Sequence, residues 1–146
     1  MHKTSNFFDK DEEARIVSAI KKAEGMTSGE IKIHLECHSG KDVLDRAAEV
    51  FENLGMFDTK NRTGVLFYLA MDERQFAIIG DLGINQKVQD SYWDGLRDRL
   101  VENFKKDRFC DGLVESIIDA GEHLRTYFPI DGEDKNEISD EISYGE

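Results

Sequence analysis

Four carboxylates have residue types and positions suited to binding a metal ion. Asp81 follows Gly80 at the end of one apolar run, and Glu30 begins another. Asp90 and Asp94 lie one helical turn apart in the segment after Asp81. Carboxylates on short glycine-containing loops are typical ligands for a hard cation, calcium first, with magnesium or manganese as alternatives. The pattern therefore predicts a divalent-cation site if the fold brings these residues together.

Structural roles also explain several of these acids. Asp90 or Ser91 suits the N-cap of a helix, and Ser91 with Asp94 has the spacing of a capping box. Asp98 and Glu102 continue the four-residue spacing. Like charges at this spacing repel one another weakly, and a solvated helix face explains the last two. Helix capping thus stays open as an alternative to metal binding for Asp90 and Asp94.

A second group of potential ligands is spaced by two residues along a predicted strand. His34, Glu36 and His38 share one strand face and could chelate zinc or manganese. A solvated strand face is the simpler interpretation. Cys37 and Cys110 lie far apart and form no CxxC pair, so we expect buried free thiols and no disulfide framework.

Composition and missing motifs exclude several classes of function. The formal net charge of −12 argues against binding to nucleic acids or to anionic membrane surfaces. The stretch "GDLGIN" is not a dinucleotide-binding GxGxxG motif, and the sequence contains neither a P-loop nor a GxSxG elbow. The N-terminus lacks the apolar region of a secretory signal, and no apolar window approaches the length of a membrane span. We therefore expect a cytoplasmic protein.

Hydrophobic periodicity predicts the elements that position these residues. Apolar residues at helical spacing follow Asp9, a suitable N-cap, and end at Gly25. The remaining pattern predicts strands over 30–39, 63–71 and 75–80, and helices over 41–55, from 85 to beyond Phe104, and over 111–129. The run "TGVLFYLAM" is apolar on both faces, which is typical of a central strand covered on both sides.

The order of the elements predicts a three-layer α/β/α sandwich with a small mixed sheet of three or four strands. A strand–helix–strand unit gives a parallel pair, and the tight turn at 72–74 makes the next strand antiparallel. This topology brings Glu30 and Asp81 to one end of the sheet and leaves Asp72 and Glu73 at the other. Residues 130–146 are predicted to form an acidic, mostly flexible tail, and Ile138, Ile142 and Tyr144 could attach part of it to the domain.

Three stretches together resemble the TPM domain family: "TSGEIKIHLE", "GVLFYLAMDERQFAIIGDLGI" and "DGLVESIIDAGEHLRTYFP". The resemblance implies an α/β/α domain over residues 1–129. It also implies an acidic loop site for divalent cations and, from a plant member, acid phosphatase activity. By position, the resemblance places Glu30, Asp81 and Asp90 in that site, whereas Asp94 is added from its spacing alone.

Three functions are consistent with these observations. The first is a calcium-like cation-binding TPM domain that acts as a cytoplasmic interaction or regulatory module for an unidentified protein partner. The second is a weak metal-dependent phosphomonoesterase, with Arg62 as a phosphate clamp and a metal-bound water held by Asp81. The third is a metal-free protein-interaction domain, in which the acids serve as helix caps and solubilising charge.

Overall fold

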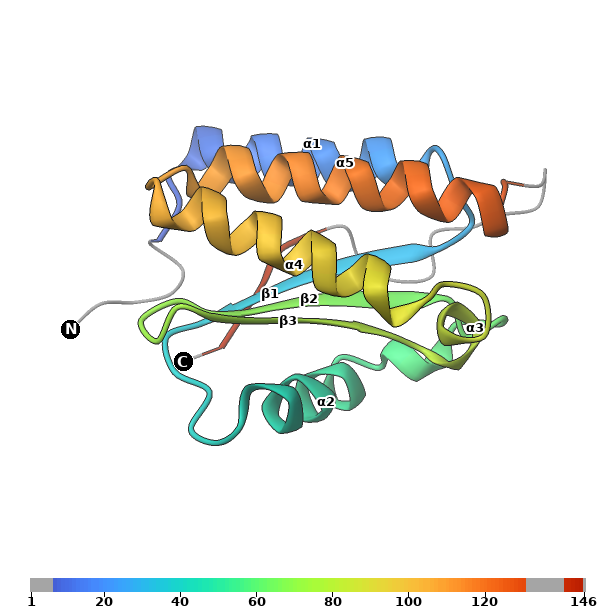
Figure 1. Ribbon diagram of the computed structural model, residues 1–146, viewed down its shortest axis with the longest axis horizontal. Helices are drawn as coiled ribbons and strands as arrows, with labels where there is room; N and C mark the ends of the chain where they lie inside the picture. The colour runs from blue at the N-terminus through green and yellow to red at the C-terminus, as the bar shows by residue number, and fades with distance from the viewer. Residues whose placement is uncertain (1–6, 131–140, 146) are drawn as a thin grey trace.

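The computed structural model describes residues 7–130 and 141–145. The helices are α1 (Lys10–Glu24), α2 (Val43–Asn53), the 3-10 helix η2 (Met56–Asp58), α3 (Leu82–Asn85), α4 (Asp90–Lys105) and α5 (Phe109–Tyr127). The strands are β1 (Glu30–Glu36), β2 (Gly64–Ala70), β3 (Gln75–Gly80) and β4 (Ser143–Tyr144). Helices α1, α4 and α5 cover one face of the sheet and α2 covers the other (Figure 1). The predicted α/β/α sandwich is therefore confirmed.

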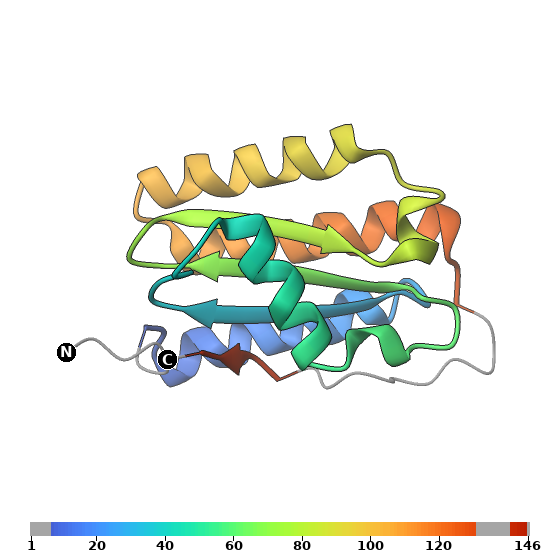
Figure 2. The same cartoon turned by 90° about the horizontal axis from the view of Figure 1, so that it is seen from below.

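The sheet has the strand order β3-β2-β1-β4. Strands β1 and β2 are parallel, β2 and β3 are antiparallel, and both arrangements agree with the prediction. The C-terminal strand β4 adds a fourth strand, parallel to β1, with His34 opposite Ser143 and Leu35 opposite Tyr144. Figure 2 shows β4 at the outer edge of the sheet, beside β1. Segments from the two ends of the chain therefore lie side by side.

Alternation along the central strands divides the core into two clusters. Under α1, α4 and α5, the strands contribute Ile31, Ile33 and Leu35 from β1 and Val65, Phe67 and Leu69 from β2. Under α2, they contribute Leu66, Tyr68, Ala70 and Ala77. Every residue of β2 is buried, which confirms that the strand is covered on both sides. Both cysteines are buried free thiols, as predicted.

Helix α1 begins as the sequence predicts, whereas α4 does not. The Asp9 carboxylate accepts from the Glu12 amide at 2.8 Å, and the Glu12 side chain accepts from the Asp9 amide at 3.1 Å. Helix α4 begins at Asp90 after an N-cap at Gln89 that makes no side-chain cap bond. The predicted cap at Asp90 or Ser91 and the capping box are therefore wrong.

Packing explains why α4 starts where it does. The segment before it forms a separate short helix, α3, whose N-cap is Asp81. Ile84 and Val88 on this segment are buried in the larger core cluster. Their burial fixes the chain path into α4, so the N-cap lies at Gln89, two residues earlier than the capping preference of Ser91 suggests.

The polar face of β1 is buried, which corrects the prediction of a solvated face. Lys32, His34 and Glu36 are 6%, 5% and 1% exposed, because α2 and the C-terminal segment cover them. His38, beyond the end of β1, is exposed as expected. The alternating pattern of β1 predicts a half-buried strand, but every residue of β1 is buried.

The C-terminal segment contributes ordered structure at residues 141–145. Ile142 and Tyr144 pack against the larger core cluster, which agrees with their predicted pinning role. Ile138 and the rest of 131–140 lie outside the described residues, so the predicted flexibility there stays a prediction. Among the described helices, none combines the length and the apolar character needed to cross a membrane.

Two helical glycines differ in their surroundings and generate a stability prediction. A Cβ at Gly121 of α5 would lie 2.7 Å from the Cβ of Ala23, where α1 and α5 cross closely, whereas a Cβ at Gly95 of α4 would meet nothing within 4 Å. We expect Gly121→Ala to lower the free energy of unfolding by about 1–3 kcal/mol through overpacking. Gly95→Ala should raise it by about 0.5–1 kcal/mol. Urea denaturation of both variants measures this, and equal stabilisation would contradict the close packing.

Candidate functional site

Asp81, the central residue of the predicted cation site, is held by an arginine. Asp81 as a residue is 4% exposed, and its carboxylate accepts from Arg62 Nε at 2.7 Å and Nη2 at 2.8 Å. The Leu82 amide donates to the same carboxylate at 2.7 Å as the cap of α3. The hydrogen bonds between Arg62 and the Asp81 carboxylate raise the pKa of Arg62. A two-pronged guanidinium contact of this kind is among the stronger ion pairs, and it places a cation directly on Asp81.

Local backbone geometry brings Arg62 to this position. Arg62 has a φ of 56°, in the left-handed region that residues with a side chain rarely adopt. Its carbonyl accepts from the Gly83 amide at 2.9 Å. A side chain at Gly83 would collide with the carbonyls of Asn61 and Arg62, so glycine permits this close approach. The loop before β2 is therefore clamped to α3 by one ion pair and one backbone hydrogen bond.

The other predicted ligands lie at the same end of the sheet but in different environments. Glu30 is the first residue of β1 and is 3% exposed. Asp90 and Asp94 are exposed in the first turns of α4, whose N-terminus follows α3 at that end (Figure 1). Within the described parts of the chain, no three His, Cys, Asp or Glu residues are grouped closely enough to hold a metal ion. The four acids thus share a sheet end without forming a ready-made cluster.

A second polar site lies on the buried face of β1, and its centre is Glu36. One carboxylate oxygen accepts from Arg46 Nη2 at 2.8 Å and lies 3.3 Å from His34 Nε2. The other accepts from Arg46 Nε at 2.8 Å and from the Tyr68 hydroxyl. Burial alone raises the pKa of Glu36, but the hydrogen bonds from Arg46, Tyr68 and His34 outweigh it and lower the pKa below its ordinary value. Glu36 is therefore a buried carboxylate that stays charged.

His34 links this carboxylate to the C-terminal strand. Its Nδ1 lies 2.8 Å from Ser143 Oγ, and its ring stacks on Tyr68 with centroids 5.9 Å apart. With Glu36 ionised, the neutral imidazole donates a hydrogen bond from Nε2 to Glu36 and accepts one at Nδ1 from the Ser143 hydroxyl. Burial, opposed by the Glu36 hydrogen bond, lowers the pKa of His34. The arrangement fixes one imidazole tautomer and, through it, the position of β4.

Backbone contacts complete the attachment of the C-terminal segment. Lys32 Nζ donates to the Glu141 carbonyl at 2.6 Å, and the Gly145 amide donates to the Leu35 carbonyl at 2.7 Å. A Cβ at Gly145 would overlap Glu36 Oε1 and would lie 2.9 Å from His34 Nε2. Glycine at this position therefore lets the main chain rest directly on the buried polar side chains.

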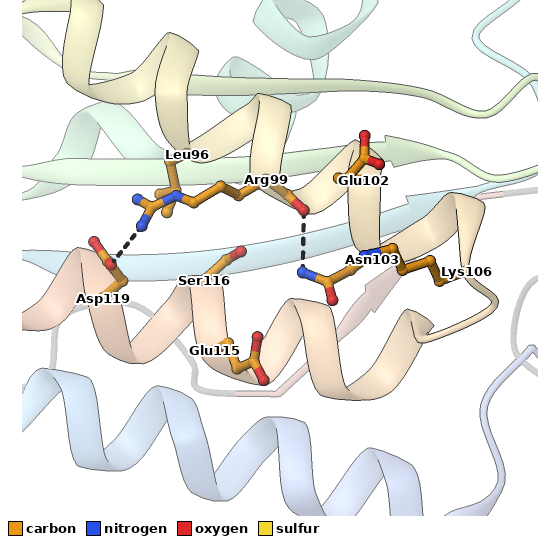
Figure 3. A pocket seen from close by; sticks show the side chains of 8 residues that line it. All are labelled: Leu96, Arg99, Glu102, Asn103, Lys106, Glu115, Ser116 and Asp119. Carbon is orange, nitrogen blue, oxygen red and sulfur yellow. Dashed lines mark hydrogen bonds and ion pairs between the residues drawn. The ribbon is translucent and has the colours of Figure 1, made fainter.

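A groove of about 310 Å³ between α4 and α5 is separate from both sites. Figure 3 shows Arg99 reaching across it to Asp119, with Nη1 3.2 Å from Oδ2, while Asn103 donates to the Arg99 carbonyl at 3.0 Å. The remaining lining residues are Leu96, Glu102, Lys106, Glu115 and Ser116. The α4 side of the groove carries both signs of charge, whereas the charged residues on the α5 side, Glu115 and Asp119, are acids. Glu102 lines it, and none of the four predicted metal ligands does.

Sequence reasoning missed the buried cluster around Glu36, and one signal could have pointed to it. Lys32, His34 and Glu36 alternate with apolar residues on a strand whose neighbour, β2, is apolar throughout. Such alternation is shared by solvated faces and by buried faces with internally balanced charge. Arg46, which donates two hydrogen bonds to Glu36, lies on helix α2. No spacing rule in the sequence connects it to a residue of strand β1.

The fold and the two polar sites define an α/β/α domain with an acidic loop end and a buried polar strand face. The sequence model of the TPM domain family matches residues 1–122, and the chain belongs to this family. The resemblance in the sequence is thereby confirmed. Comparison with proteins that have curated descriptions gave no match.

Solved structures agree with this assignment. The BA42 protein from the psychrophilic bacterium Bizionia argentinensis is 47% identical, with a TM-score of 0.90 over 95% of this chain and 96% of that chain. The N-terminal domain of a P. gingivalis protein is 18% identical, with a TM-score of 0.68 over 85% and 80% of the two chains. The N-terminal domain of cg2496 from Corynebacterium glutamicum is 13% identical, with a TM-score of 0.63 over 97% and 82%. The last two share the fold alone.

The lowered pKa of His34 predicts a specific pH dependence of stability. Because the unfolded chain binds this proton more readily, the folded state loses stability as the pH falls below the ordinary histidine value of about 6.5. We expect the free energy of unfolding to fall more for wild type than for His34→Gln between pH 7.5 and 5.5. His38→Gln, at the exposed histidine, should behave like wild type in urea denaturation. Equal losses in all three proteins would contradict the assignment.

Proposed function

We propose that this TPM domain is a cation-responsive binding module rather than an enzyme. A divalent cation, calcium first and magnesium or manganese as alternatives, replaces the Arg62 guanidinium at Asp81. The observation that carries the proposal is the contact of both Asp81 oxygens with a cationic group at 2.7 and 2.8 Å. A nearly buried carboxylate that already holds one cation at a loop end has the chemistry to hold another.

The surroundings of Asp81 support exchange between the two cations. The Arg62 side chain is 42% exposed, so it can leave for solvent, whereas the Asp81 side chain is 2% exposed. Asp90 and Asp94 are exposed at the start of α4, at the same end of the sheet. The helix N-terminus also offsets part of their mutual repulsion. With Glu30, these acids are the further ligands that we assign to the bound cation once Arg62 has left.

Displacement of Arg62 gives the module a way to signal. The Arg62 guanidinium lies 4.9 Å from the ring centroid of Phe57, and Phe57 is 45% exposed. Leu82, beside Asp81 on α3, is 57% exposed. Loss of the arginine would uncover one face of the Phe57 ring near the clamped loop. A protein partner that recognises this apolar surface would then respond to the cation concentration.

Phosphomonoester hydrolysis is the less favoured function. It requires Arg62 to clamp a phosphate and Asp81 to hold a metal-bound water. In the described conformation these two side chains neutralise each other. A phosphate would have to draw Arg62 away from a nearly buried carboxylate, which costs a charge-assisted ion pair. Phosphatase activity that Asp81→Asn abolishes would favour this alternative over the module.

Competition between arginine and metal gives a direct test. We expect Arg62→Gln to bind calcium about tenfold more tightly than wild type, equivalent to about 1.4 kcal/mol, because the internal competitor is gone. Asp81→Asn should lose the binding. Titration calorimetry measures the affinity, and amide NMR should show residues 30, 81 and 90 shifting together.

Two variants at the far end of the sheet control for net charge (Figure 1). Arg108→Gln makes the same charge change beside Asp111 and Glu115, and Asp72→Asn removes an acid from the β2–β3 turn. Both should bind calcium as wild type does. If Arg108→Gln tightens binding as much as Arg62→Gln, the effect is general electrostatics and the proposed site is wrong.

A further inference from the structure

The outer edge of β1 is closed by two other parts of the same chain. At its start, the Ile31 amide donates to Glu24 Oε2 at 2.9 Å. Toward its end, the Leu35 carbonyl accepts from the Gly145 amide. Open strand edges recruit further strands, and proteins usually block them. The C-terminal segment therefore occupies a position where an extended peptide adds to the sheet.

The contacts of this segment define what the edge recognises. Lys32 on this edge donates to a main-chain carbonyl, His34 hydrogen-bonds a hydroxyl side chain, and Glu36 leaves room only for a glycine. Tyr144 lies between the last two positions, and its hydroxyl donates to Glu13 of α1. These requirements describe a short extended segment with the pattern Ser-Tyr-Gly, preceded two residues earlier by an accepting carbonyl.

The attachment within one molecule is small. The ladder pairs two residues of β4 with two of β1, which is short for a strand. Its placement depends on side chains of β1 and α1 that stay in position through contacts of their own, such as the Glu36–Arg46 pair. The docking site can thus persist when the segment leaves.

We propose that the edge of β1 is a docking site for the C-terminal segment of a second copy of this chain, which takes the place that residues 141–145 occupy here. Every copy carries both the site and the matching segment, so exchange requires no new surface. Within one molecule, covalent attachment gives the segment an effective concentration on the order of millimolar. Exchange therefore competes at high protein concentration or when the internal segment is defective.

Complementation between two defective full-length variants tests the proposal. Gly145→Val has a defective segment and an intact edge, because the new side chain would collide with Glu36 and His34. His34→Val has an intact segment and a defective edge, because the partner of Ser143 is gone. Each variant alone should remain monomeric. An equimolar mixture at a concentration on the order of 1 mM should form heterodimers, detected by light scattering of the eluted complex.

A matched mixture provides the control. His38→Val replaces the exposed histidine just beyond β1 and leaves the segment on its own edge. Its mixture with Gly145→Val should form much less heterodimer than the mixture with His34→Val, because the segment must first leave an intact edge where its effective concentration is on the order of millimolar. A mixture of Gly145→Val with His34→Val that stays monomeric would overturn the proposal.

Peptide binding keeps the test decisive if His34→Val fails to fold. The probe is an acetylated peptide of residues 141–146, and the matched probe carries Val at the position of Gly145. Full-length Gly145→Val should bind the first peptide at least about tenfold more tightly than wild type does, with amide shifts at residues 34–36. It should not bind the second. Equal binding of both peptides, or of neither, overturns the docking site.

Discussion

The charged Glu36 carboxylate in the interior is the constraint on which much of this structure depends. A buried carboxylate without partners is costly, so surrounding elements must supply donors. Arg46 supplies them from α2, Tyr68 from β2 and His34 from β1 itself. One charge thus fixes the position of α2 over the sheet and the orientation of the imidazole that holds β4. Removing a donor would leave part of this charge unbalanced inside the protein.

The same principle operates differently at the acidic end of the sheet. Asp81 is also nearly buried, but its arginine partner comes from a loop and is partly exposed. Arg46, the guanidinium partner of Glu36, also has a partly exposed side chain (28%), but Glu36 keeps the buried donors Tyr68 and His34, which have no alternative in solvent. At Asp81 the exposed Arg62 guanidinium can leave and be hydrated, while the Leu82 amide stays on the carboxylate. The Glu36 pair is therefore suited to a permanent structural role, and the Asp81 pair is suited to exchange. Two carboxylates of one fold acquire different roles from the exposure of their partners.

The two ends of β1 place these roles far apart within one small domain. Its first residue, Glu30, pairs with Gly64 beside the loop of Arg62, and its last residue, Glu36, lies under the C-terminal segment. The proposed cation response and the proposed segment exchange therefore involve opposite ends of the same central strand. Strand β1 and its neighbour β2 are completely buried, so β1 is a rigid connection between the two sites.

Local patterns in the sequence were sufficient for the four long helices α1, α2, α4 and α5, for the strands β1, β2 and β3 with their pairing, and for the layer arrangement, whereas the short elements η2, α3 and β4 were missed. Periodicity, the "DER" turn and the Asp9 cap depend on neighbours in the chain, and handedness rules extend them to topology. Tertiary structure alone decided that Glu36 meets Arg46, that Asp81 meets Arg62, and that Ser143 reaches His34. These pairs join residues 10, 19 and 109 positions apart. Their formation depends on which faces the packed layers bring together, and alternation in a strand does not distinguish a solvated polar face from one whose charges are balanced from other elements.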